Sequence, residues 1–163
     1  MSARDSRTLG PDGAARGANP ASERTGTRLY WLAALLSLVG MADAVYLTVE
    51  HLAGGTVRCT VTAGCSEVLG SPYATVGGVP LAGLGALAYF AAFSLALLVA
   101  FGYTRARALL FFLVALMLLV TLWLLYLQAF VLHAFCQYCL LSAALTLALG
   151  LIVVFDGFIL RRR

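Results

Sequence analysis

The chain has 163 residues, of which 62% are hydrophobic and only 11% are charged, and its formal net charge is +4. This much apolar composition excludes an ordinary soluble domain and indicates a polytopic membrane protein. The basic residues are all arginine and are not interleaved with aromatic residues, so the charge gives no reason to invoke nucleic acid. It is better explained by membrane topology and attraction to anionic lipid.

Four segments reach the roughly 20 apolar residues needed to cross a bilayer. These segments are 29–49, 81–101, 108–131 and 136–160. We therefore expect an all-α integral membrane fold, a four-transmembrane-helix bundle whose extracytoplasmic loop between the first two spans carries a short amphipathic turn at 66–69. The expected divisions are a disordered cytoplasmic tail (1–28), the membrane domain (29–160) and a basic cytoplasmic end (161–163). Gly83 and Gly85 in the second span are small residues of the kind that let helices approach closely.

The arginines predict the orientation of the spans. All but one of the 11 basic residues precede the first span, join the second to the third, or end the chain, and only Arg58 lies in a connection of the other parity. Because cytoplasmic loops carry the excess of basic residues, we expect both termini in the cytoplasm. The loops after the first and third spans are then expected outside.

The four cysteines form two pairs, both on the predicted outer side. Cys136 and Cys139 open the last span as a C-x-x-C, which places the thiols about one helical turn apart at a helix N-terminus that favours thiolate. Cys59 and Cys65 lie in the connection 51–80, the longest between spans, and a loop this long in a small bundle is usually functional. Because C-x-x-C dithiols are often exchange-active, the spacing and topology favour redox catalysis.

Other interpretations of the cysteines fit less well. A haem attachment motif needs His directly after the second Cys, and the residue there is Leu140. A zinc site is conceivable by count, but C-x5-C does not match the short knuckles of structural zinc sites. Static disulfides suit an outward face, yet a bridge across one helical turn constrains little chain. A non-catalytic membrane scaffold with structural disulfides and a metal-handling membrane protein remain the alternatives.

A few other side chains are candidates for the site. Asp43 is the one acidic residue within the first span, and a carboxylate at such depth is by default functional, here as a proton relay. The tight turns after Cys65 predict a cap that turns Leu69, Tyr73 and Val76 inward over an apolar pocket. Trp123 and Tyr126, near the outer end of the third span, fit an interfacial belt, and aromatic walls are also what ligand pockets use.

The segments around the cysteines resemble the vitamin K epoxide reductase family in its bacterial form. The resemblance covers Leu29 to about Leu160, and it rests on the four spans, the cysteine order and the runs Cys65–Ala74, Gly78–Leu81 and Cys136–Cys139. It implies a four-helix bundle around a quinone in a bacterial cytoplasmic membrane. Under this resemblance, the candidates for quinone contact are Leu69, Tyr73, Trp123 and Tyr126.

The resemblance also implies a function, that of a quinone-dependent thiol oxidase supporting disulfide bond formation. Electrons are expected to pass from a reduced thioredoxin-fold partner to Cys59 and then by thiol–disulfide exchange from Cys65 to Cys136. Cys139 is expected nearest the quinone, either ubiquinone or menaquinone, that accepts the electrons.

The sequence departs from the family pattern in two places. Many bacterial members carry a thioredoxin-like domain after the bundle, whereas this chain ends at Arg163, so a separate extracytoplasmic partner is expected. The animal enzymes have a tyrosine four residues after the second cysteine of the C-x-x-C, and the matching residue here is Ala143. A membrane quinone is therefore the expected oxidant, in place of vitamin K epoxide.

Overall fold

The computed structural model describes the backbone of residues 20–54 and 64–161, and the side chains of 26–54 and 64–157. Most of the predicted disordered tail therefore lies outside the described residues, and so does Cys59. From Pro20 onward the chain is helical, so the first helix begins before the expected limit at Leu29.

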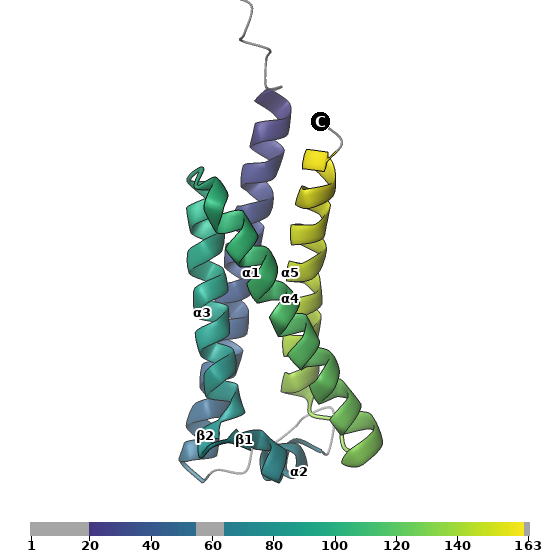
Figure 1. The fold of residues 1–163 in the computed structure, drawn as a ribbon. Coiled ribbons are helices and arrows are strands. Elements are labelled where there is room, and N and C mark those ends of the chain that lie inside the picture. Colours follow the sequence, from purple (N-terminus) through teal and green to yellow (C-terminus); the bar gives the residue numbers. More distant parts are fainter. Residues whose placement is uncertain (1–19, 55–63, 162–163) are drawn as a thin grey trace, which may run out of the picture.

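Four long helices make up the bundle (Figure 1). They are α1 (Pro20–Leu52), α3 (Leu81–Ala100), α4 (Thr104–Tyr126) and α5 (Gln137–Arg161). Four stretches are long and apolar enough to cross a membrane, namely Gly26–Leu52, Leu81–Ala100, Thr104–Val131 and Gln137–Gly157. The predicted four-helix membrane bundle is confirmed.

The outer surface of the bundle is apolar on every helix. One residue from each of the four helices illustrates this, because Leu35, Leu87, Phe112 and Leu151 are 60%, 66%, 69% and 72% exposed. Water would oppose the exposure of such side chains, whereas lipid tails are as apolar as the side chains themselves. The bundle is therefore built to face lipid.

The turn between α3 and α4 is a Schellman motif. Gly102 has a φ of 95°, and its N–H donates to the Val99 carbonyl while the N–H of Tyr103 donates to the Leu98 carbonyl. A left-handed residue at this position is most easily glycine, and the two hydrogen bonds satisfy the last carbonyls of the helix. The tight turn makes α3 and α4 antiparallel neighbours.

Tyr89 of α3 joins three helices in the interior. Its ring packs on Gly40 of α1, where a Cβ would collide with the ring. Its hydroxyl lies 2.9 Å from Ser142 and Thr146 of α5. The tyrosine is 2% exposed, so this polar group is buried with its partners supplied. The contact fixes α3 against α1 and α5.

A polar cluster ties the helices together at the end of the bundle where the described chain begins and ends. The Tyr30 hydroxyl of α1 donates to a carboxylate oxygen of Asp156 in α5, and Arg107 of α4 lies 3.6 Å from the same oxygen. Asp156 is only 6% exposed, and burying a charged carboxylate costs desolvation free energy. The hydrogen bond from Tyr30 and the charge of Arg107 offset that cost. The cluster lies far from the cysteine end.

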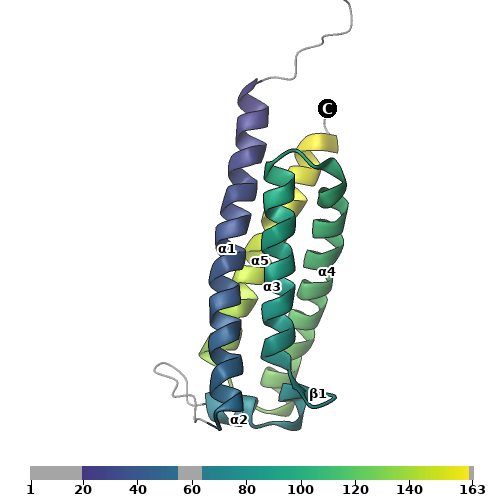
Figure 2. The ribbon, with the colours of Figure 1, turned by 90° about the vertical axis from the view of Figure 1, so that its left-hand side faces the viewer.

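The connection before α3 crosses the opposite end of the bundle (Figures 1 and 2). It contains α2 (Cys65–Leu69), a 3₁₀ turn η2 (Pro72–Ala74), and the strands β1 (Thr75–Val76) and β2 (Val79–Pro80). The strands pair antiparallel around Gly77 and Gly78, whose φ angles of 59° and 82° form a primed hairpin turn. The sequence predicted the turns here but not the strand pairing.

Candidate functional site

The chain changes its helical form just before the C-x-x-C. After Tyr126, α4 continues as a π-helical segment, η3 (Leu127–Val131), in which the Leu132 N–H donates to the Leu127 carbonyl at 2.8 Å. His133 then adopts a positive φ of 49°, a backbone conformation that few residues other than glycine adopt readily. These two irregularities redirect the chain from α4 into α5. Such π-helical turns are frequent at functional sites.

Cys136 occupies the N-terminal cap of α5. Its sulfur receives hydrogen bonds from the Cys139 thiol and from the backbone N–H groups of Tyr138 and Cys139. The Cys139 thiol makes the largest contribution to lowering the pKa of the Cys136 thiol, and burial acts in the opposite direction. Both cysteines are free thiols, so the structure holds the C-x-x-C as a dithiol whose first sulfur is the better nucleophile.

The loop cysteine Cys65 lies beside this dithiol. Cys65 and Cys136 are 1% and 0% exposed, and both belong to one cluster of buried residues that also contains Leu47 of α1. Cys65 takes part in a disulfide bond. The structure thus brings together three of the four cysteines named from the sequence, and the fourth, Cys59, lies outside the described residues.

A cavity of about 140 Å³ lies under the cap, between α1, α3, α4 and α5. Most of its wall is aliphatic, including Leu47, Leu81 and Leu124. A cavity of roughly 150 Å³ accommodates benzene in another protein, so this one has room for a single aromatic or quinonoid ring. The lining fits the apolar ring of a quinone.

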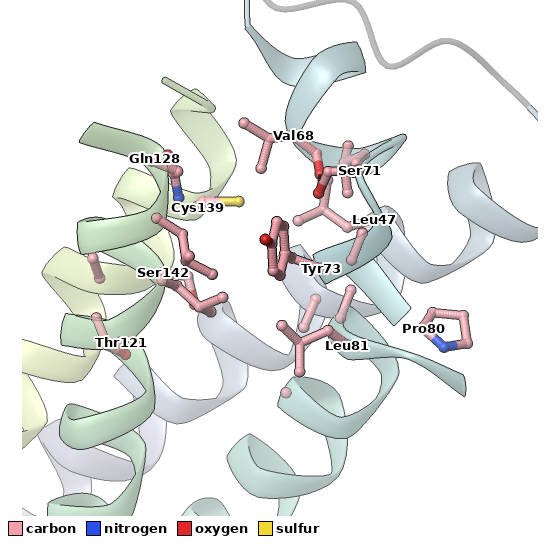
Figure 3. Close-up of a pocket in the computed structure, with 18 of the residues that line it drawn as sticks. Leu47, Val68, Ser71, Tyr73, Pro80, Leu81, Thr121, Gln128, Cys139 and Ser142 are labelled. Carbon is pink, nitrogen blue, oxygen red and sulfur yellow. Dashed lines mark hydrogen bonds between the residues drawn. The ribbon is translucent and has the colours of Figure 1, made fainter. Parts of the chain in front are cut away.

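The two cysteines of the C-x-x-C differ in their relation to this cavity. Cys139 lines it and Cys136, which is fully buried, does not. Figure 3 shows the Cys139 sulfur directed into the cavity, across from Tyr73. The first cysteine of the dithiol therefore belongs to the buried cluster of the loop cysteine, and the sulfur of the second faces the cavity.

Asp43 also lines the cavity, from α1. One of its carboxylate oxygens, Oδ2, is buried and has no hydrogen-bond partner among the described residues. Burying an oxygen without a hydrogen-bond donor costs free energy, and ionisable residues within membrane spans commonly have a function. The carboxylate is placed where it can exchange a proton with a ligand in the cavity.

The four side chains named as candidate quinone contacts separate into two groups. Leu69 and Tyr73, both from the cap, line the cavity. Trp123 and Tyr126 do not, because they are 59% and 52% exposed and stack on each other on the outer face of α4. That position suits aromatic residues at a membrane interface.

Sequence reasoning missed Gln128. This residue of η3 is 2% exposed, lines the cavity, and accepts a hydrogen bond from the Cys136 N–H at 3.1 Å. The sequence did contain a signal, because Gln128 is a polar amide in a mostly apolar span shortly before the C-x-x-C. Burying a polar side chain within a span costs free energy, so its presence there indicates a function.

Metal binding has no visible basis in the part of the chain that the structure describes. Within those residues no group of three or more His, Cys, Asp or Glu side chains is placed to hold an ion.

The fold and the site together define a class, a membrane oxidoreductase that holds a dithiol between a buried loop cysteine and an apolar cavity. The vitamin K epoxide reductase family model matches residues 31–154. The chain therefore belongs to the vitamin K epoxide reductase family, and the resemblance seen in its sequence is confirmed. Membership implies quinone-coupled thiol oxidoreductase chemistry.

Proposed function

We propose that the protein oxidises the thiols of a separate thioredoxin-fold partner and delivers the electrons to a membrane quinone, and thereby supports disulfide bond formation. The observation that carries the proposal is the arrangement of three cysteines, with Cys65 packed in one buried cluster with Cys136 and with Cys139 facing the cavity. Cys59, the outermost of the four in this scheme, receives electrons from the partner.

The relay consists of thiol–disulfide exchanges that conserve electrons. The partner dithiol becomes a disulfide as it reduces the Cys59–Cys65 pair, and the Cys65 thiolate then attacks Cys136 of an oxidised C-x-x-C, releasing the Cys139 thiolate. Attack by Cys59 on Cys65 frees Cys136 and restores the loop disulfide. The dithiol of Cys136 and Cys139 now holds two electrons.

Oxidation of that dithiol closes the cycle. A quinone bound in the cavity accepts two electrons and two protons, which the dithiol gives up as its disulfide forms. The Cys139 sulfur faces the cavity, and the hydrogen bonds at the α5 N-terminus favour the Cys136 thiolate. Asp43 is the proposed proton-exchanging group, because its unpartnered carboxylate oxygen belongs to the cavity lining.

The proposed orientation follows the arginine distribution. The described chain begins and ends at one end of the bundle, and the cap with Cys65 lies at the other (Figure 1). Placing the arginine-rich ends in the cytoplasm turns the cap outward. A multi-pass protein of the bacterial cytoplasmic membrane would then meet its thioredoxin-fold partner on the extracytoplasmic side.

The test is quinone reduction by the purified protein in detergent, with a reduced thioredoxin-fold protein as the donor. Ubiquinone and menaquinone analogues are supplied separately to identify the acceptor. We expect turnover that requires all four cysteines, and a Cys65–Cys136 disulfide that accumulates in Cys139→Ala. A stable Cys59–Cys136 bridge in that variant would overturn the relay order. If both cysteine pairs stayed oxidised at potentials between about −120 and −270 mV, the static-disulfide scaffold would be the better assignment.

A further inference from the structure

Gln128 is a buried amide whose hydrogen bonds can be followed atom by atom. A glutamine side chain has one acceptor oxygen and an NH₂ group with two donor hydrogens, and a buried amide normally has partners for both. Gln128 is 2% exposed, so protein groups or a ligand have to supply them.

The oxygen of this amide is accounted for. The Cys136 backbone N–H donates to Oε1 at 3.1 Å, and because an amide NH₂ cannot accept that bond, the contact fixes which atom is oxygen and which is nitrogen. The backbone carbonyl of the same residue accepts from the Ala134 N–H at 3.2 Å. Gln128 therefore holds the linker into the C-x-x-C at two points.

The nitrogen of the amide faces a different environment. Among the described residues no acceptor is found for its Nε2, while Gln128 lines the cavity beside Cys139 (Figure 3). Ser71 donates to the Val68 carbonyl and Ser142 is bonded to Tyr89, so neither of these lining hydroxyls is paired with Nε2. The nitrogen is left as a donor in a wall that is mostly aliphatic.

We propose that Gln128 donates a hydrogen bond from Nε2 to a carbonyl oxygen of the bound quinone while its Oε1 holds the N-terminus of α5. This inference rests on the proposed function, which places the quinone head group in the cavity. A single planar amide then connects the ligand carbonyl to Cys136. Hydrogen bonds in such a chain polarise one another, so ligand binding and the backbone at the C-x-x-C become coupled.

The test is isotope-edited infrared spectroscopy of ubiquinone-1, labelled at one carbonyl at a time, bound to the full-length protein. A hydrogen bond lowers the stretching frequency of the carbonyl that accepts it. In the wild type we expect one carbonyl band to lie below its position in an apolar solvent. In Gln128→Met, which keeps the side-chain length, we expect that shift to be lost and binding of ubiquinone-1 to weaken about threefold to tenfold.

Trp123→Leu provides the matched control, because this residue is exposed near the same end of α4 and does not line the cavity, so the band should stay shifted. Two unshifted carbonyl bands in the wild type would overturn the role of Gln128 even if the methionine variant failed to fold. A shift retained in Gln128→Met would do the same. If ubiquinone-1 still binds, either of these two results leaves the proposed function intact. If the wild type does not bind ubiquinone-1, the role of Gln128 and the proposed function are both overturned.

Discussion

A Cβ added to Gly64 would lie 2.8 Å from the amide nitrogen of Phe135. The loop residue before Cys65 therefore touches the chain immediately ahead of Cys136. The other close atoms are the Ala134 Cβ at 2.9 Å and the Phe135 carbonyl oxygen at 3.0 Å. Backbone atoms cannot rotate away, so only glycine permits this approach of α2 to the C-x-x-C.

Gly64→Ala tests whether this approach sets the rate of the relay. The φ and ψ of Gly64, −92° and 5°, are open to alanine, so the effect of the substitution should be steric. Because a misplacement of about 1 Å can cost a hundredfold in rate, we expect partner-driven quinone reduction to fall about tenfold to a hundredfold. Stopped-flow thiol exchange between the loop pair and the C-x-x-C measures the step directly.

The same variant should oxidise its C-x-x-C normally when dithiothreitol reduces that pair directly, since the cavity is unchanged. Ser66→Ala, an exposed position in α2, is the matched control and should retain full activity. Wild-type rates of partner-driven turnover in Gly64→Ala would show that the approach of the two segments does not limit transfer.

The glycines show which parts of the site local sequence can predict. Hydrophobic length identified the four spans, and the C-x-x-C spacing located the dithiol at a helix N-terminus. Gly83 and Gly85 were expected at close helix contacts, yet a Cβ there would make only ordinary contacts at 3.6 and 3.9 Å. Among the described residues, an added Cβ would come closer than 3.0 Å to a neighbouring atom at Gly40, Gly64, Gly70 and Gly150. Which glycine meets a neighbour depends on how helices rotate and cross, and that is decided by long-range packing.

The side chains of the cavity illustrate the same limit. Turn residues predicted a cap that turns Leu69, Tyr73 and Val76 inward. Leu69 and Tyr73 line the cavity, but the prediction was wrong for Val76, which is 56% exposed and does not line it. Trp123 and Gln128 lie on one helical stretch, but only the glutamine faces the cavity. The π-helical turn at Leu127–Val131 changes the register of side chains there, and no period of 3.6 residues anticipates it.

Cys139→Ala should raise the pKa of the Cys136 thiol. The Cys139 thiol makes the largest contribution to lowering that pKa, and removing it leaves burial, which raises it, opposed only by the backbone N–H groups. The pH range over which the Cys136 thiolate forms should therefore move upward. Ultraviolet absorbance of the thiolate, recorded against pH with Cys59 and Cys65 replaced by alanine in every protein compared so that Cys136 cannot enter a mixed disulfide, measures the midpoint.

The transition should disappear in Cys136→Ala, which assigns the signal to that sulfur. If the midpoint were the same in the wild type and in Cys139→Ala, the thiol–thiolate hydrogen bond would not be what tunes Cys136.

Gly40→Ala should destabilise the bundle. The added methyl group would collide with the Tyr89 ring, which is held in place by its hydrogen bonds to α5. Overpacking of this kind typically costs about 1–3 kcal/mol. Thermal unfolding in detergent, followed by circular dichroism, should show a lower midpoint for Gly40→Ala.

Gly83→Ala is the matched control, because its Cβ would meet Thr48 at an ordinary 3.6 Å and alanine favours helix over glycine. Its midpoint should equal or exceed that of the wild type. Equal loss of stability in the two variants would mean that the Gly40–Tyr89 contact has no special role in the packing.

Asp43→Asn tests the proposed proton exchange at the cavity. The substitution keeps the size of the side chain but removes its titratable oxygen, which is the buried Oδ2 without a hydrogen-bond partner among the described residues. A positioned acid or base typically contributes a factor of about 10² to 10⁴. We therefore expect kcat for quinone reduction to fall about a hundredfold or more, while the Cys65–Cys136 disulfide still forms in a Cys139→Ala background.

Glu50→Gln, on the same helix but outside the lining, should leave kcat unchanged. If kcat of Asp43→Asn stayed within about twofold of the wild-type value, Asp43 would not be on the proton path. Solvent or another group would then deliver the protons to the quinone.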